Sequence, residues 1–157
     1  MSFHRNYHKP FAASMAVSLL LGASAACLAD DAKDIKPLAL RTIMQGMGKN
    51  MQVMTDGISR SDWMLVEKSA ALLADHPQPP AEEKARIIGL FGAEMGKFKG
   101  YDSETHDHAL AAGVAAKAGD GAAVIRAFGQ LQTSCLGCHT TFREPFVAHF
   151  YGKKRTP

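Results

Sequence analysis

The sequence predicts an all-α domain in which four helices pack as an antiparallel bundle. Apolar residues recur at intervals of three and four in four successive segments, and almost no segment alternates apolar and polar residues as a strand would. Short connections join these segments, which favours antiparallel neighbours. With 157 residues, 46% of them hydrophobic and 21% charged, the chain can bury one ordinary core.

Residues 1–29 have the composition of an export signal. A start with Arg5 and Lys9 is followed by the apolar stretch "FAASMAVSLLLGASAACLA" and then by "DDAKD". The stretch is interrupted by Ser and Gly, and it is short for a membrane span, which needs about 20 apolar residues. We expect cleavage after Ala29; cleavage after Ala25 and acylation of Cys27 are the less favoured alternatives. The prediction is a mature domain of residues 30–157 in the periplasm, with no membrane anchor.

Two amphipathic helices are predicted in the first half of the mature chain. Residues 35–57 place a stripe of long apolar side chains on one face and end at Gly57; the stripe consists of Leu40, Met44, Met47, Met51 and Met54. Residues 59–76 predict the second helix, in which Ser59 and Asp62 resemble a capping box.

The second half of the chain predicts two further long helices. Residues 81–98 carry three glycines, so we expect only a short helix and a loop there. Ser103 is expected to cap the third long helix, which ends at Gly119. Asp120 is expected to start the fourth, which Pro145 closes.

The motif "TSCLGCH", residues 133–139, is the strongest functional signal. C-x-x-C-H is the attachment sequence for a covalently bound haem, in which Cys135 and Cys138 join the two vinyl groups and His139 ligates the iron. On a helix all three side chains can project from one face. A disulfide between the two cysteines is the alternative. A zinc site would need a fourth ligand, and a thioredoxin-like site would need alternating strands and helices.

The late position of this motif resembles the cytochrome c′ class, whose exported members carry the haem on the last of four helices. The resemblance rests on "KAGD" (117–120), on "AFGQLQTSCLGCHTTFR" (127–143) and on "LRTIMQGMGKNM" (40–51). It covers essentially the whole mature chain. Ordinary small cytochromes c carry the motif near the start instead.

The resemblance implies the remaining site residues. Low-spin relatives place a methionine of the first helix opposite the histidine, and Met44 stands in that register; Met47, one turn further on, is its rival. Arg143 corresponds to a basic residue near the haem and is the expected propionate partner. Leu40 replaces the basic residue of the family pattern, with Arg41 next to it.

Other residues receive structural interpretations. We expect Met51 and Met54 in the core, since most methionines at helical spacing pack there. Phe128 and Phe142 are expected to line the haem pocket. The remaining histidines are expected outside the site: His106 and His108 solvated, His76 in a loop and His149 on the surface.

These observations predict an electron carrier and not an enzyme. A haem c with both axial positions filled by His139 and Met44 can cycle one electron but gives oxygen or peroxide little access to the iron. Sixteen basic and 15 acidic residues remain from Asp30 onward, so transient redox proteins are the expected partners, with no patch for nucleic acid. The resemblance leaves a homodimer open. If Met44 does not bind the iron, the alternative is a five-coordinate protein that binds nitric oxide or carbon monoxide; a peroxidase is the weakest interpretation.

Overall fold

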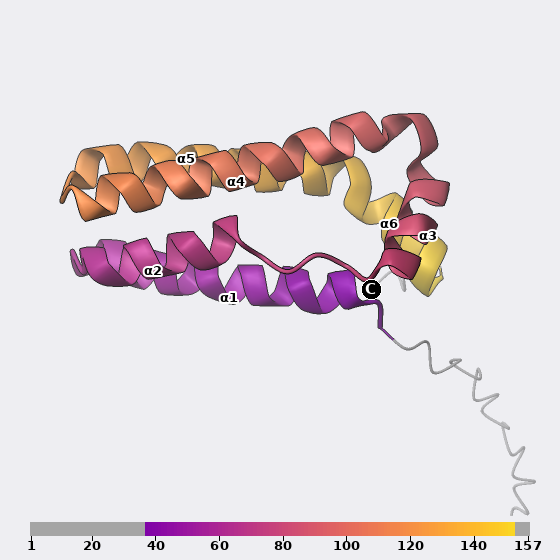
Figure 1. Ribbon diagram of the computed structural model, residues 1–157, viewed down its shortest axis with the longest axis horizontal. Coiled ribbons are helices and arrows are strands. Elements are labelled where there is room, and N and C mark those ends of the chain that lie inside the picture. Colours follow the sequence, from indigo (N-terminus) through magenta and orange to yellow (C-terminus); the bar gives the residue numbers. More distant parts are fainter. Residues whose placement is uncertain (1–36, 153–157) are drawn as a thin grey trace, which may run out of the picture. The chain divides into compact units, whose positions relative to one another are not determined.

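The computed structural model describes residues 37–152, and the predicted signal segment, including Cys27, lies outside them. Figure 1 shows a domain built of helices. In chain order these are α1 (Ala39–Ser59), α2 (Trp63–Ala74), α3 (Ala81–Phe91), the 3₁₀ turn η1 (Gly92–Glu94), α4 (Met95–Lys117), α5 (Gly121–Cys138), the π-helical turn η2 (His139–Arg143) and α6 (Glu144–Tyr151). The antiparallel packing of α1, α2, α4 and α5 confirms the four-helix prediction. Within residues 37–152, no helix is both long and apolar enough to cross a membrane.

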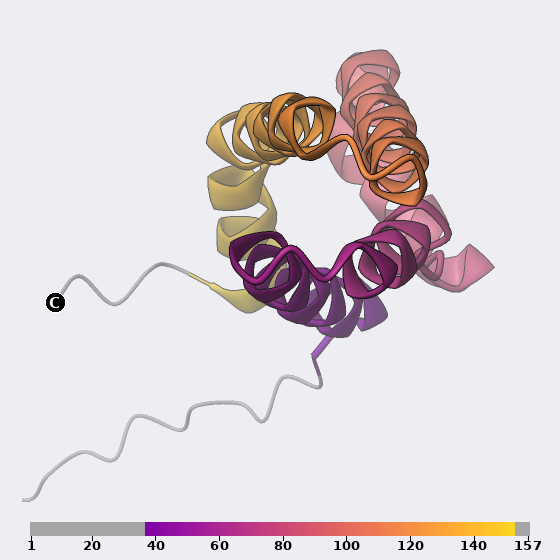
Figure 2. The same cartoon turned by 90° about the vertical axis from the view of Figure 1, so that its left-hand side faces the viewer.

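The four long helices form a ring when the bundle is viewed along its axis (Figure 2). The helix α4 lies between α2 and α5 and packs extensively on both, and α1 packs on α2. By contrast, α1 and α5 touch at few points, although they are neighbours in the ring. The seam between α1 and α5 is therefore the loosest of the four.

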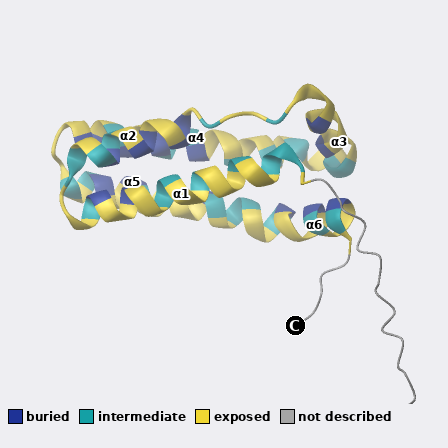
Figure 3. Cartoon of the chain, turned by 90° about the horizontal axis from the view of Figure 1, so that it is seen from below, coloured by how far each residue is buried: buried dark blue, intermediate teal, exposed yellow. Residues whose placement is uncertain are grey.

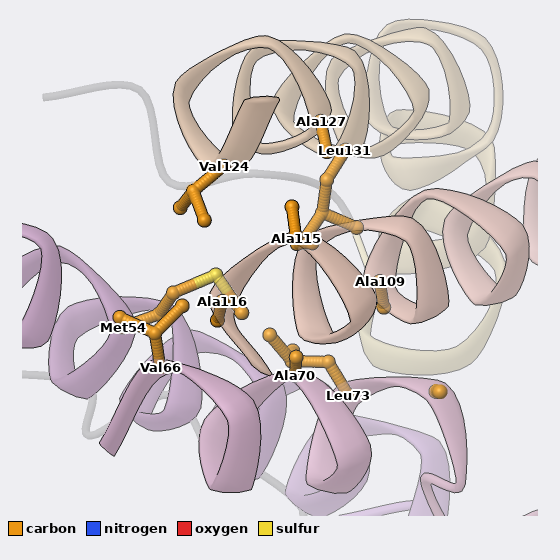
Figure 4. Close-up of a cluster of buried hydrophobic side chains, with 12 residues drawn as sticks. Met54, Val66, Ala70, Leu73, Ala109, Ala115, Ala116, Val124, Ala127 and Leu131 are labelled. Atoms are coloured by element: carbon orange, nitrogen blue, oxygen red, sulfur yellow. The ribbon is translucent and has the colours of Figure 1, made fainter. Parts of the chain in front are cut away.

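All four long helices contribute to one apolar core (Figure 4). The members from α4 are all alanines, whereas the other helices contribute five larger side chains and three alanines: Met54, Val66, Ala70, Leu73, Ala74, Ala109, Ala112, Ala115, Ala116, Val124, Ala127 and Leu131. Small residues on α4 let α2 and α5 approach closely. The contribution of α1 is slight, since Met54 and Gly57 are its only buried residues (Figure 3).

The helix ends at the α1–α2 turn differ from the prediction. The side chain of Asp62 alone caps α2, by accepting from the backbone N–H of Leu65 at 3.1 Å, whereas the Ser59 hydroxyl donates to the carbonyl of Thr55 inside α1. Gly57 does not end α1. It is buried, and a Cβ there would lie 3.0 Å from a methyl group of Val66, so this glycine serves close packing of α1 on α2.

The prediction for the third long helix was wrong at its start. Ser103 lies inside α4, which begins at Met95 and includes Gly96 and Gly100. The chain turns one residue after α3 at Gly92, whose φ of +47° lies in the region that glycine tolerates best. Tertiary packing of α4 on α2 and α5 outweighs the weak helix propensity of Gly96 and Gly100.

The fourth helix was predicted correctly at its start and wrongly at its end. The side chain of Asp120 caps α5 by accepting from the Ala123 N–H at 2.9 Å. The chain stays helical through η2 and α6 to Tyr151, because Pro145 falls in the first turn of α6, where a missing N–H costs little. Here α6 packs on α3 through Ile87, Phe146 and Phe150.

The N-terminus of α1 is held at the same end of the bundle. The carboxylate of Glu83 on α3 accepts from the backbone N–H groups of Ala39 at 2.7 Å and Leu40 at 2.8 Å. These donors have no partner within α1, so Glu83 caps it from another element. Arg41 lies over the Tyr151 ring at 5.7 Å, which joins α1 to α6.

Candidate functional site

The C-x-x-C-H motif forms the last turn of α5. Cys135 and Cys138 are half-buried free thiols, and Cys138 is the last residue of the α-helix. His139 follows as the first residue of η2 and is exposed. A π-helical turn is rare and often accompanies a functional site, because it changes the direction of the side chains that follow it.

The helix α4 forms one wall of this site. The Thr105 hydroxyl lies 3.1 Å from the Ser134 hydroxyl and donates to the carbonyl of Tyr101 at 2.8 Å. The Tyr101 ring packs on Gly137, the residue before Cys138, so closely that a Cβ at Gly137 would lie 2.5 Å from a ring carbon. The motif is thus supported from the side by Tyr101 and Thr105.

Both thiols are less acidic than an exposed cysteine. Burial raises the pKa of Cys135, although a hydrogen bond with Thr105 opposes the shift. Burial raises the pKa of Cys138 to about 11, and the charges of Cys135 and Asp102 add to this effect. These shifts favour protonated thiols at neutral pH, so neither cysteine is expected to be a reactive thiolate.

The surroundings of His139 favour the neutral imidazole near pH 7. Partial burial lowers its pKa, and the positive charge of Arg143 lowers it further. A neutral imidazole keeps a nitrogen lone pair, which is what a metal ion requires. Arg143 itself is exposed on η2, so its expected role toward a propionate stays a prediction.

Helical geometry places Met44 on the α5 side of α1. Gly57, which contacts Val66 of α2, lies about 60° to one side of the buried Met54, and Met44 lies about 80° to the other side. The neighbours of α1 in the ring are α2 and α5. Because Gly57 marks the α2 side, Met44 faces the seam, where it is 37% exposed.

The same geometry places His139 on the α1 side of α5. Ser134, which contacts Thr105 of α4, lies about 60° to one side of the buried Leu131, and His139 lies about 80° to the other side. The neighbours of α5 are α4 and α1, so His139 also faces the seam. Two side chains that can ligate iron therefore face the same loose junction.

The other methionines lie closer to the core. Met54 is fully buried, which confirms its expected place, while Met47 and Met51 are partly buried against the same cluster. Met47 also lines an open groove of about 540 Å³ between α1 and the segment that follows α2, together with Ile43 and Asn50. Packing thus distinguishes Met47 from Met44.

The two phenylalanines expected in a haem pocket occupy different places. Phe142 on η2 is 4% exposed and packs against Phe91, Phe98 and Tyr101, with ring centroids 4.9 to 6.4 Å away. It anchors η2 to the start of α4. Phe128 is partly buried against the main core.

The histidines beyond the motif include a pair that sequence reasoning missed. His76 is a loop residue, as predicted, but its side chain is only 7% exposed and its Nε2 lies 3.2 Å from Asp102 Oδ1. His106, which was expected to be solvated, is partly buried, and its Nδ1 lies 3.0 Å from the carbonyl oxygen of Ala74. No sequence signal joins His76 to Asp102, because the contact forms only when α2 packs on α4. His149 is exposed, as expected.

Comparison with known proteins gives no family assignment. Neither a protein-family model nor a curated protein matches the chain. Across the described residues 37–152, no three His, Cys, Asp or Glu side chains gather as a metal-binding group. The site combines two protonated thiols, a neutral imidazole and a thioether beside one loose seam.

Proposed function

We propose that this protein is a periplasmic c-type cytochrome of the cytochrome c′ class, which carries single electrons through a low-spin haem. One observation carries the proposal: a C-x-x-C-H motif ends the last long helix of a four-helix bundle, and its histidine faces the loosest seam of that bundle. Covalent haem attachment uses two thiols and an imidazole in this order.

The residues present fit a covalent haem. Cys135 and Cys138 are protonated and half-buried, so each can add its sulfur to a vinyl carbon and its proton to the neighbouring carbon. His139, being neutral, offers a nitrogen lone pair to the iron. Near this junction α1 buries no side chain between Ala39 and Val53, so the seam can accept a further apolar group.

The protein supplies ligation, support and shielding. Haem, once bound, supplies a one-electron couple at its iron. Tyr101 and Thr105 hold the motif turn against α4, and Phe142 fixes the start of the following segment. The thioether of Met44, as sixth ligand, would exclude oxygen and peroxide from the open position and favour the reduced state.

A five-coordinate, gas-binding protein is the second candidate. Met44 is 37% exposed and has no place among the side chains of either apolar cluster, so packing alone does not hold it toward α5. If its sulfur does not bind the iron, this position is open to nitric oxide or carbon monoxide.

Partners are inferred from the charge of the mature chain. Sixteen basic and 15 acidic residues from Asp30 onward give almost no net field for steering. We therefore propose transient encounters with redox proteins that give or take one electron, and an export signal in residues 1–29 that brings the protein to the periplasm.

The test is the mass and spectrum of protein matured with a bacterial haem-attachment system. We expect the mass to rise by one haem that survives denaturation, with a pyridine haemochrome spectrum of the c type. Cys135→Ala and Cys138→Ala should each weaken the covalent hold. Leu136→Ala, at a 63% exposed position between the two cysteines, is the matched control and should keep the haem. A mature protein with a Cys135–Cys138 disulfide and no haem would contradict the proposal.

A further inference from the structure

A partly buried ion pair joins the segment that follows α2 to α4. His76 follows α2 by two residues, and its Nδ1 lies 3.0 Å from the carbonyl oxygen of Leu73. Its Nε2 lies 3.2 Å from Oδ1 of Asp102, which projects from α4. The imidazole is 7% exposed, whereas the Asp102 side chain is 47% exposed, so only the carboxylate has ready access to water.

This geometry determines the protonation state of the imidazole. A backbone carbonyl and an ionised carboxylate both accept hydrogen bonds, so each ring nitrogen of His76 must donate. Only the protonated imidazolium has two N–H groups. In agreement, the hydrogen bond with Asp102 raises the pKa of His76 above its usual 6.5, although burial opposes the shift. The same bond lowers the pKa of Asp102.

The pair is close to the proposed haem attachment point. Tyr101, the residue before Asp102, packs on Gly137, the residue before Cys138. A change of charge at this pair therefore changes the potential felt at the last turn of α5.

The other charged groups around the pair are few. Charges of His106 on α4 and Lys84 on α3 act on Asp102, and the titratable group of α5 at this end of the bundle is the thiol of Cys138. A groove of about 400 Å³ beside the pair also contains Lys99, Ser103 and Gln78. From α1, only uncharged residues line the groove that includes His76, namely Ala39, Thr42, Ile43, Gly46, Met47 and Asn50. Of these groups, Asp102 is the direct partner of His76.

We propose that His76 and Asp102 form a proton-binding site whose occupancy is coupled to the oxidation state of the haem. This inference rests on the proposed function. Between the pKa of His76 in the ferric protein and its higher pKa in the ferrous protein, the imidazole would be neutral while the iron is ferric. It would take one proton from water when a redox protein supplies one electron to the iron. The added electron is then balanced by the added proton, so the net charge of the pair and the iron together is unchanged. The protein would carry a hydrogen equivalent across part of the pH range.

The coupling gives a measurable slope. Loss of the positive charge on His76 favours ferric iron, so the midpoint potential should fall as the pH rises through the pKa of His76. One proton per electron changes the redox equilibrium tenfold per pH unit, which is about 59 mV for a one-electron couple. Partial coupling through the protein should give a smaller slope, confined to the region above pH 6.5.

The experiment is a potentiometric titration of the haem-loaded protein at a series of pH values, combined with ¹⁵N NMR of the His76 ring. We expect a sloping potential in the wild type and a higher pKa for His76 in the ferrous than in the ferric protein. His76→Gln should make the potential flat in this region. Asp102→Asn should move the slope to lower pH, because His76 loses the partner that raises its pKa. His106→Gln, which removes the neighbouring imidazole, is the matched control and should keep the slope.

Each outcome decides. A c-type haem with a flat potential in the wild type, or equal His76 pKa values in the two oxidation states, would overturn the coupling while leaving the proposed function intact. A slope that survives His76→Gln but disappears in His106→Gln would overturn the proposal, because it would show that the proton binds at His106. Should His76→Gln not fold, Asp102→Asn and the wild-type NMR titration still decide. Absence of any attached haem would instead refute the proposed function, and this inference with it.

Discussion

The two ends of the four-helix bundle close in different ways. At the end with the α1–α2 and α4–α5 turns, the fully buried side chains of Met54, Val66 and Val124 fill the space between the helices. At the other end, the first 15 residues of α1 include no buried side chain, and Met44 faces α5 while 37% exposed. The first end is filled by side chains of the four long helices, whereas at the second α3 and α6 form their own apolar cluster and the seam between α1 and α5 leaves Met44 partly in water.

The helix ends differ between the two ends of the bundle in the same way as the packing does. At the closed end, α2 and α5 begin with capping aspartates, Asp62 and Asp120, and Trp63 packs on Gly121 so closely that a Cβ there would lie 2.9 Å from the indole. At the open end, α5 ends in the π-helical turn η2 and an ion pair of His76 and Asp102 lies at the wall. Regular capping and packing stabilise the first end, and irregular, polar features collect where we place the function.

The largest expected effect comes from shortening equivalent methionines at the two ends of α1. Met54→Ala should lower the free energy of unfolding by about 2–5 kcal/mol, because it leaves a cavity in a fully buried site. Met44→Ala should cost far less in the haem-free protein, because this side chain is already partly in water. Urea denaturation of both variants measures the difference. Equal losses would show that the two ends are packed alike.

A second pair of variants compares two glycines of α5. Gly137→Ala should destabilise the protein by about 1–3 kcal/mol, because its Cβ would lie 2.5 Å from the Tyr101 ring. Gly129→Ala has no atom within 4 Å and should stabilise the helix by up to about 1 kcal/mol. Thermal denaturation measures both. The combined variant Gly137→Ala/Tyr101→Ala should relieve the clash, and a Gly137→Ala protein as stable as the wild type would remove Tyr101 as a support of the motif.

Much of the fold could be predicted from local sequence. The period of the apolar residues predicted four helices, and the capping preference of Asp120 predicted the start of α5. The prediction was wrong at positions where the same residue type can serve two structural roles. Glycine is typical of a helix end, but Gly57 serves close contact with Val66. Serine is typical of an N-cap, but Ser103 lies inside α4, since the chain already turns at Gly92.

In the candidate site, too, local features could be predicted from the sequence, whereas contacts between distant elements could not. The C-x-x-C-H motif is local, so sequence alone could identify Cys135, Cys138 and His139. Tyr101 contacts Gly137 and His76 contacts Asp102 across 36 and 26 residues of the chain, respectively. Their spacing depends on how α2, α4 and α5 pack, and no short pattern in the chain encodes it.

The smallest expected effect is on the pH dependence of stability. The folded pKa of His76 is raised above 6.5, so its pairing with Asp102 contributes fully below pH 6.5 and is lost as the pH rises through the folded pKa. The pKa of Asp102 is lowered from 3.8, so its contribution is present above pH 3.8 and is lost as the pH falls through the folded value. Denaturation midpoints should therefore decline on the alkaline side of this window. The decline should be weaker in Asp102→Asn. An unchanged decline in that variant would show that this pH dependence does not come from the His76–Asp102 pair.

The absorption spectrum of the haem-loaded protein tests most directly whether Met44 and His139 close the seam around one iron. We expect the ferric wild type to be low-spin with a sulfur-to-iron charge-transfer band. Met44→Ala should abolish the band, give a high-spin haem and allow carbon monoxide to bind readily, while Met51→Ala should keep a spectrum near that of the wild type. A band that survives Met44→Ala but not Met47→Ala would contradict the ligand assignment. A wild type that lacks the band and binds carbon monoxide rapidly would instead be a gas-binding protein.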